Sequence, residues 1–248
     1  MSKRYRPAIR QLVHNTKEQK TDVSFQLESF NSDSRFDDIV NYREEVTCFT
    51  FGISDIYRKE KTVRFFSMSV QTGCAGVGSN PIWDDFTYSD YSLLQGGLTK
   101  VWYPDENWTY LAKFNGQYGF HRLSQSRVFQ IGGMATVRGT PEGLMTGDSG
   151  YVASFEARRR LTEGHHKVGV EAFGFFDHGG VFNRVYPVDD HPSDFLFSIG
   201  TGFNINWSRY VTSTIGYGQP LFTAESHREQ YREKLRHGNA YFTVRAQF

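Results

Sequence analysis

The stretch FLFSIGTGFNINW, residues 195–207, alternates large apolar side chains with small or polar ones. One set of alternate positions holds Phe195, Phe197, Ile199, Phe203, Ile205 and Trp207. The other set holds Ser198, Gly200, Gly202, Asn204 and Asn206. Because successive side chains of a β-strand point to opposite faces, this period of two indicates a strand with one apolar and one polar face.

The same alternation recurs along the chain and predicts ten strands. In residues 107–119 the apolar face carries Trp108, Tyr110, Ala112, Phe114 and Tyr118. In the C-terminal AYFTVRAQF, residues 240–248, it carries Ala240, Phe242, Val244, Ala246 and Phe248. The predicted strands cover roughly residues 22–30, 46–57, 62–73, 92–103, 107–119, 150–161, 167–182, 194–207, 210–218 and 240–248.

Composition agrees with a β-rich protein. The 248 residues include 22 Phe, 14 Tyr and 24 Gly, the mean hydropathy is −0.53, and no apolar run approaches the roughly 18 residues of a membrane-spanning helix. A formal net charge of +1 gives no electrostatic reason to expect a nucleic-acid partner. Residues 1–20 lack the apolar core of a secretory signal peptide. A membrane β-barrel fits because it confines its hydrophobicity to alternate residues.

The connections between the predicted strands also alternate in length. Short turns fall near residues 58–61, 104–106, 162–166 and 208–209. Long polar segments cover residues 31–45, 74–91, 120–149, 183–193 and 219–239. This pattern is typical of an outer-membrane barrel whose short turns are periplasmic. Aromatic residues flank two of the short turns, as in an interfacial girdle: Trp102, Tyr103, Trp108, Trp207 and Tyr210.

A soluble antiparallel barrel or sandwich would alternate too. The strands here are long, however, and the chain ends on Phe248, which lies on an apolar face. Both features favour the membrane barrel. We therefore predict an all-β, antiparallel transmembrane β-barrel in the bacterial outer membrane, in contact with the lipid bilayer. Residues 1–20 are expected to be a lead-in, the remnant of a preceding strand or a linker. Residues 21–248 are expected to form the barrel portion, with a long loop at 120–149.

One stretch of that loop, GGMATVRGTPEGLMTGDSGYVASFE (residues 132–156), contains the tetrapeptide GDSG at 147–150. In a chymotrypsin-like protease this tetrapeptide would carry the nucleophile. Only His14 and His121 precede Ser149 in the chain, and neither has the sequence surroundings of the catalytic histidine. We therefore predict no enzymatic activity.

Metal and cofactor sites are not expected either. His165 and His166 lie in a predicted turn and lack a third ligand at metal spacing. Two cysteines, Cys48 and Cys74, are too few for a four-cysteine zinc site. Strand alternation places these cysteines on opposite faces, which argues against a disulfide between them. No glycine-rich phosphate loop is present, so we predict no metal and no cofactor.

Arg138 is the residue of the loop that would most clearly need charged partners if the loop were buried. A loop of about thirty residues is too long to be a passive connection. If it folds back into a barrel lumen, the guanidinium loses water and needs carboxylate partners. Strand alternation points Glu156 and Asp177 inward, and Glu171 shares the face of Asp177. The alternative is a solvated arginine in a surface loop.

Several motifs, in order, resemble those of a known family. Ile131-Gly132-Gly133 followed by Val137-Arg138-Gly139 resembles the lumen loop of the TpsB transporters, the haemolysin secretion/activation proteins of two-partner secretion (ShlB/FhaC/HecB type). These belong to the superfamily that includes the barrel-assembly insertase. Further matches are the strand at 150–156, the Phe-x-Asp-x-Gly motif at 175–179 with Gly180 after it, the Tyr-Gly-x-Pro-Leu segment at 217–221, and the terminal Phe248.

The resemblance implies a function and a set of site residues. The loop motif would be Val137, Arg138, Gly139 and Thr140, anchored by Asp177 or Glu156, with Gly179 and Gly180 as motif glycines. The C-terminal signal read by the barrel-assembly machinery would include Phe242, Val244 and Phe248. The chain would be part of an outer-membrane pore that exports a haemolysin-like or adhesin-like partner protein. The alternatives are a small porin or adhesin barrel with binding loops, and a fragment of an outer-membrane protein assembly factor.

Two features depart from the family pattern. An aromatic residue usually follows the Arg-Gly pair, whereas this chain has Thr140. The family also carries a signal peptide, a plug helix, two periplasmic domains and a sixteen-stranded barrel. The ten predicted strands would correspond to the last ten of those sixteen, so we expect part of a transporter; a closed ten-stranded barrel is the other possibility.

Overall fold

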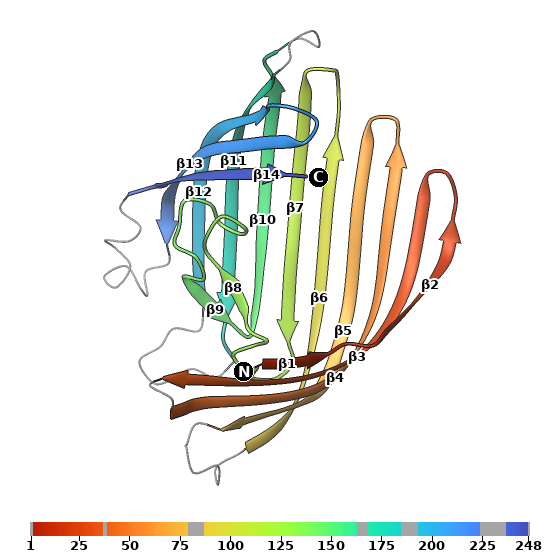
Figure 1. The fold of residues 1–248 in the computed structure, drawn as a ribbon, viewed down its shortest axis with the longest axis vertical. Helices are drawn as coiled ribbons and strands as arrows, with labels where there is room; N and C mark the ends of the chain where they lie inside the picture. The colour runs from red at the N-terminus through yellow and green to blue at the C-terminus, as the bar shows by residue number, and fades with distance from the viewer. Residues whose placement is uncertain are drawn as a thin grey trace.

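The computed structural model describes residues 2–36, 39–78, 87–162, 168–184, 193–223 and 237–247. Within these ranges nearly all regular structure belongs to one antiparallel sheet of twelve strands, in the order β1-β3-β4-β5-β6-β7-β10-β11-β12-β13-β14, with β2 also paired to β3 (Figure 1). A separate two-stranded sheet, β8-β9, lies in the loop between β7 and β10. No helix in the described ranges is long and apolar enough to cross a membrane.

The ten predicted strands all form, and the predicted all-β fold class is confirmed. They are β3 (Gln19–Phe36), β4 (Ile39–Lys59), β5 (Thr62–Gly78), β6 (Thr87–Trp102), β7 (Trp108–Gly119), β10 (Ser149–Arg160), β11 (Gly169–Phe182), β12 (Ser193–Asn206), β13 (Val211–Thr223) and β14 (Asn239–Ala246). Every neighbouring pair is antiparallel.

Two further strands occupy the N-terminal edge of the sheet. β1 (Ser2–Tyr5) pairs with Ser29–Ser32 of β3, and β2 (Ala8–Asn15) pairs with the preceding half of the same strand. Pro7 separates the two because a proline has no backbone N–H to donate to the ladder. Its carbonyl still accepts a hydrogen bond from the Leu27 N–H at 3.1 Å, so residues 2–15 act as one interrupted edge strand.

Several strands extend beyond their predicted ends, and the prediction of a long loop at residues 31–45 is wrong. There β3 and β4 stay paired as far as Phe36 and Ile39. Likewise, β5 continues to Gly78 and β13 to Thr223. In these extensions the backbone pairing continues although the apolar alternation of the predicted strands stops, and some of the added residues, such as Glu44 and Ala75, are buried.

The described turns at one rim of the sheet are short. The β2–β3, β4–β5, β6–β7 and β12–β13 turns lie together at the top of Figure 1. Two residues join β4 to β5, and five join β6 to β7. At the other rim the β7–β10 connection has 29 residues, whereas only two residues separate β3 from β4. The short turns agree with the pattern in the sequence, and the β3–β4 connection departs from it.

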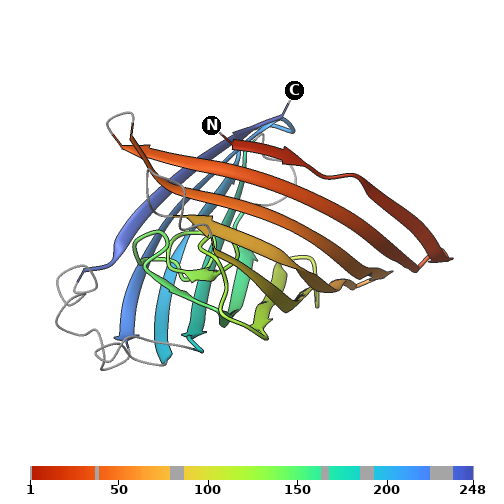
Figure 2. The same ribbon diagram turned by 90° about the horizontal axis from the view of Figure 1, so that it is seen from below.

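Seen from below, the sheet curves around a concave side that holds the β7–β10 loop (Figure 2). Its end strands, β1/β2 and β14, are not paired with each other in the described residues, so the sheet is an open part of a barrel. The convex face is apolar and exposed, as the predicted alternation requires; it includes Phe114, Phe176, Ile199, Phe203, Trp207, Ile215 and Phe242. This face has the character of a lipid-facing surface.

The two cysteines are free thiols that face opposite sides of the sheet. Cys48 lies opposite Gly73 in the β4–β5 ladder, whereas Cys74 lies opposite Thr47. Cys48 is fully buried beneath the loop, and Cys74 is partly exposed. No disulfide can join them across the sheet in this register.

Candidate functional site

Residues 120–148 leave β7, lie against the concave face of the sheet and return to β10 (Figure 2). Within them β8 (Phe129–Ile131) and β9 (Met145–Gly147) form a small hairpin. An apolar cluster joins this loop to the wall; it comprises Ile131, Val137 and Met145 from the loop and Val152, Val181 and Leu196 from β10, β11 and β12. Burial of each apolar side chain of this size contributes roughly 1.5–3 kcal/mol to stability. These contacts therefore hold the loop firmly against the wall.

Arg138 is bound to two inward-facing carboxylates beneath the loop tip. Its Nε and Nη2 atoms donate to the two oxygens of Asp177 at 2.7 and 2.8 Å. Its backbone N–H donates to Asp177 Oδ2 at 3.0 Å. The Nη1 atom binds Glu156, and Nη2 also donates to the Ser154 hydroxyl at 3.1 Å. The fork of the guanidinium thus matches the carboxylate of Asp177 in a bidentate geometry.

The anchor is almost dry, and its charges balance locally. The side chain of Asp177 is fully buried, and Arg138 and Glu156 are only 14% and 6% exposed. Arg158 donates to the other oxygen of Glu156 at 2.6 Å, so two arginines face two carboxylates. Burial alone would lower the pKa of Arg138, but hydrogen bonds and charge from Asp177 and Glu156 raise that pKa above its usual value. Arg138 therefore stays charged.

Arg138 also lies over an aromatic ring. Its guanidinium carbon is 3.5 Å from the ring centroid of Phe175, the first residue of the Phe-x-Asp-x-Gly motif. In a buried site this cation–π contact adds roughly 2 kcal/mol. The motif therefore supplies both the carboxylate and the ring that hold the arginine.

Glycines allow the loop tip to approach the wall closely. Gly139 has φ +86°, and a Cβ there would lie 2.3 Å from the carbonyl oxygen of Gly218 on β13. A Cβ on Gly179 would lie 3.0 Å from Val137 Cγ2, so this motif glycine makes room for the loop. Gly180 faces the opposite side, where a Cβ would collide with the Phe195 ring at 2.8 Å. Only the first of the two motif glycines lies at the site.

Three hydrogen bonds close the tip and attach it to β14. The hydroxyl of Thr140 donates to the Val137 carbonyl at 2.7 Å and accepts from the Gly133 N–H at 3.1 Å. Asn239, at the start of β14, donates to the Gly139 carbonyl at 2.9 Å. Val137, Arg138, Gly139 and Thr140 therefore contact β10–β14 or brace one another.

Hydrogen bonds to backbone N–H groups engage both polar side chains of the GDSG segment, Asp148 and Ser149. Ser149 Oγ accepts a hydrogen bond from the Gly119 N–H at 3.0 Å. Asp148 accepts from the backbone N–H groups of Leu123 at 2.7 Å and Arg184 at 3.1 Å. These contacts fasten the point where the loop enters β10, as expected for a loop exit.

The other predicted residues lie away from the anchor. Phe242 and Val244 are 64% and 58% exposed on the convex face of β14, and Phe248 lies outside the described residues.

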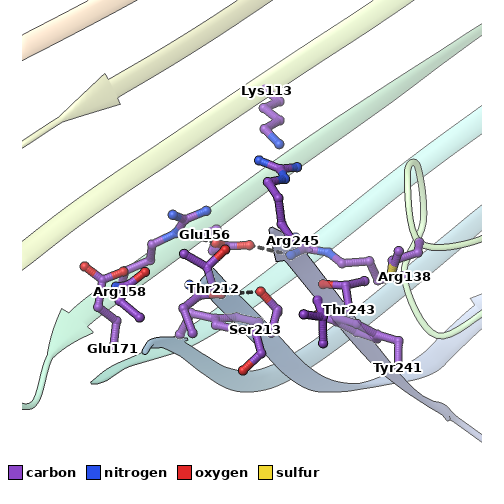
Figure 3. Close-up of a pocket in the computed structure, with 16 residues that line it drawn as sticks. Lys113, Arg138, Glu156, Arg158, Glu171, Thr212, Ser213, Tyr241, Thr243 and Arg245 are labelled. Carbon is purple, nitrogen blue, oxygen red and sulfur yellow. Dashed lines mark hydrogen bonds and ion pairs between the residues drawn. The ribbon is translucent and has the colours of Figure 1, made fainter. Parts of the chain in front are cut away.

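Glu171 does not contact Arg138. It lines a cavity of about 620 Å³ on the short-turn side of the anchor (Figure 3). Lys113, Arg158, Tyr241 and Arg245 also line this cavity, so the space beside the loop tip is polar. Within the described ranges, no group of three or more metal-ligating side chains occurs.

A second set of polar contacts to the loop was not predicted. Arg127 forms an ion pair with Glu28 at 3.1 Å, and Ser126 donates to Glu44 at 2.6 Å. Strand alternation could have marked Glu28 as inward-facing, but nothing in the sequence links it to Arg127.

The curved sheet, its apolar convex face and the loop fixed in its concave face define part of an outer-membrane β-barrel. Over residues 1–205 the sequence matches the family described as haemolysin secretion/activation protein ShlB/FhaC/HecB. The chain belongs to this family of two-partner secretion transporters, which are proteins of the bacterial outer membrane.

Solved structures agree on the fold. CdiB from Escherichia coli has a TM-score of 0.80 and 16% identity, covering 100% of this chain and 45% of its own. CdiB from Acinetobacter baumannii has a TM-score of 0.76 and 17% identity, covering 98% and 41%. The chain thus spans less than half the length of either structure. No curated protein sequence matches it significantly.

Proposed function

We propose that this chain forms part of the wall of an outer-membrane pore that exports a partner protein, and that the Arg138 loop is needed for export. The exported chain, of haemolysin or adhesin type, would pass along the concave face as an extended segment. The convex face would contact lipid. The barrel-assembly machinery would read the C-terminal strand, including Phe242, Val244 and Phe248, during insertion.

The observation that carries this proposal is the anchor at Asp177. A buried carboxylate that receives three hydrogen bonds from one loop residue fixes the position of that residue tightly. The loop then occupies space on the concave side, where an exported chain would pass. Its placement therefore sets the free cross-section of the lumen on this side.

The polar cavity beside the tip supports the same role. Its lining mixes charged groups of both signs, carboxamides and hydroxyls from the loop, from β7 and from β10 to β14 (Figure 3). An extended polypeptide carries unpaired backbone donors and acceptors, so it is stabilised by a polar wall rather than an apolar one. A porin would also have a polar lumen, so the test must distinguish protein export from the passage of small solutes.

The test is secretion by cells that carry Arg138→Ala. We expect less partner protein in the medium, while the variant still reaches the outer membrane as a folded, heat-modifiable band. Arg122→Ala is the matched control, because Arg122 is an exposed arginine in the same loop. If both variants secrete the partner equally well, the loop is not needed for export. A wild-type protein that passes small solutes but secretes no partner would indicate a porin.

A further inference from the structure

Glu28, on β3, is the centre of a second buried ionic cluster. Its side chain is 2% exposed and lies close to three guanidinium groups. Arg4 Nε and Arg6 Nη2 lie 3.2 and 3.0 Å from Oε1, and Arg127 Nη2 lies 3.1 Å from Oε2. Arg4 and Arg6 come from the N-terminal edge of the sheet, whereas Arg127 belongs to the loop. One carboxylate therefore joins two separate parts of the chain.

The same part of the loop, residues 120–128, is here called the stem. Its Leu123 and Val128 pack on an apolar cluster of the β3–β6 wall that comprises Phe30, Val46, Cys48, Ala75, Tyr91 and Leu93. Ser126 adds a hydrogen bond of 2.6 Å to Glu44 of β4. The stem is thus held by one ion pair, one charged hydrogen bond and apolar contacts.

These contacts lie on a different wall from those of Arg138. The stem rests on β3 to β6, and the tip binds β10, β11, β13 and β14. Figure 2 shows the loop within the curve between these groups of strands. We propose that Arg127 and Glu28 are positioning residues that form a second anchor, and that the loop ties the two walls together. This second anchor can be tested without any secretion assay.

The two anchors differ in what remains when the loop arginine leaves. Without Arg138, Asp177 loses its cation and keeps the Ser154 hydroxyl at 2.6 Å as a side-chain donor. Without Arg127, Glu28 keeps both Arg4 and Arg6. Because an isolated buried charge is strongly destabilising, release of the stem leaves a smaller penalty than release of the tip. We therefore expect the stem to detach from the wall more readily than the tip of the loop.

Cys48 provides a native reporter for the stem. It is fully buried in the cluster under Leu123 and Val128. In the membrane-embedded protein with Cys74→Ser, we expect Arg127→Gln to increase the rate of Cys48 labelling by a hydrophilic maleimide about tenfold, the scale of one lost contact to a charged group. Loss of a nearby cation does not itself activate a thiol, so faster labelling reports exposure.

The control for this experiment is Arg122→Gln in the same background, which should label at the parental rate. All variants are first checked for a heat-modifiable band, so that only folded protein is compared. Equal labelling of the Arg127→Gln and Arg122→Gln variants would overturn the second anchor. A loss of secretion without faster labelling would leave the export proposal standing and remove this one.

A second measurement separates charge from packing. Glu28→Gln leaves three guanidinium groups around a neutral amide, which is a repulsive arrangement. Adding Arg127→Gln removes one of the three cations and should therefore restore part of the lost resistance to denaturation. If Arg127 served only to fill space, the double variant would be less stable than Glu28→Gln alone. That outcome would refute an ionic anchor.

Discussion

The Arg138–Asp177 contact predicts a specific pattern of energies in a double-mutant cycle. The variants are Arg138→Ala, Asp177→Ala and the combination of both. In the intact site, two side-chain hydrogen bonds and one backbone hydrogen bond run from Arg138 to Asp177. The carboxylate is fully buried and the arginine side chain is 14% exposed, so solvent screens the pair only weakly.

The magnitudes follow from what each change leaves behind. Arg138→Ala strands the Asp177 charge in a dry site and should lower the free energy of unfolding by about 3–5 kcal/mol. Asp177→Ala leaves Arg138 with Glu156 and Ser154, so the loss should be about 1.5–3 kcal/mol. The double variant has no stranded charge at this position. It should be no worse than Arg138→Ala, so the magnitude of the coupling energy is at least the Asp177→Ala loss, about 1.5–3 kcal/mol.

The assay is unfolding of the membrane-embedded protein in guanidinium chloride, followed by tryptophan emission and by loss of the heat-modifiable band. Secretion of the partner protein, measured in parallel, should follow the same non-additive pattern. If the two single losses simply add in the double variant, the residues act independently. The loop would then be held mainly by its apolar cluster, and the reasoning from the ion pair would be refuted.

Three further outcomes follow from the geometry. Gly218→Ala places a Cβ 2.8 Å from the Gly139 nitrogen; it should lower stability by about 1–3 kcal/mol and reduce secretion, whereas Gly174→Ala, whose nearest contact would be 3.9 Å away, should do neither. Thiol titration after denaturation without reductant should find two free thiols per chain, because Cys48 and Cys74 face opposite sides of the sheet; a count near zero would require a different register. Deletion of Phe248 should reduce the amount of heat-modifiable protein in the outer membrane, and an unchanged amount would exclude a role in assembly.

The fold was predictable because its outer face must be apolar. Lipid cannot hydrogen-bond to the chain, so a crossing strand keeps a mainly apolar outer face, as in the alternation from Phe195 to Trp207. The ends of the strands were not predictable by the same rule. At Phe36 and Ile39 the backbone ladder continues, although the sequence there does not alternate. The edge strands lie within residues 1–20, the segment expected to be the remnant of a strand or a linker; alternation could not decide between the two, since the side chains of Ala8–Asn15 are exposed on both faces.

The tip of the loop could be anticipated, but its stem could not. Arg138 lies in a recognisable motif, and alternation turns Asp177 inward from the next strand but one, so few partners were available. Arg127 instead finds Glu28 on β3, at the other end of the sheet. Curvature of the whole sheet brings these residues together, and no local pattern encodes that curvature. Ion pairs between a lumen loop and distant strands therefore cannot be predicted from the sequence alone and require a structure.

Thr140 resolves the departure from the family pattern at the tip. An aromatic residue at this position would have to find space against the wall, where Gly139 already lies within contact of Gly218. Thr140 is instead 5% exposed and turns back to bond the Val137 carbonyl and the Gly133 N–H. The turn is thus closed from within, and the tip is attached to the wall by Arg138, by the apolar contacts of Val137 and by the hydrogen bond from Asn239.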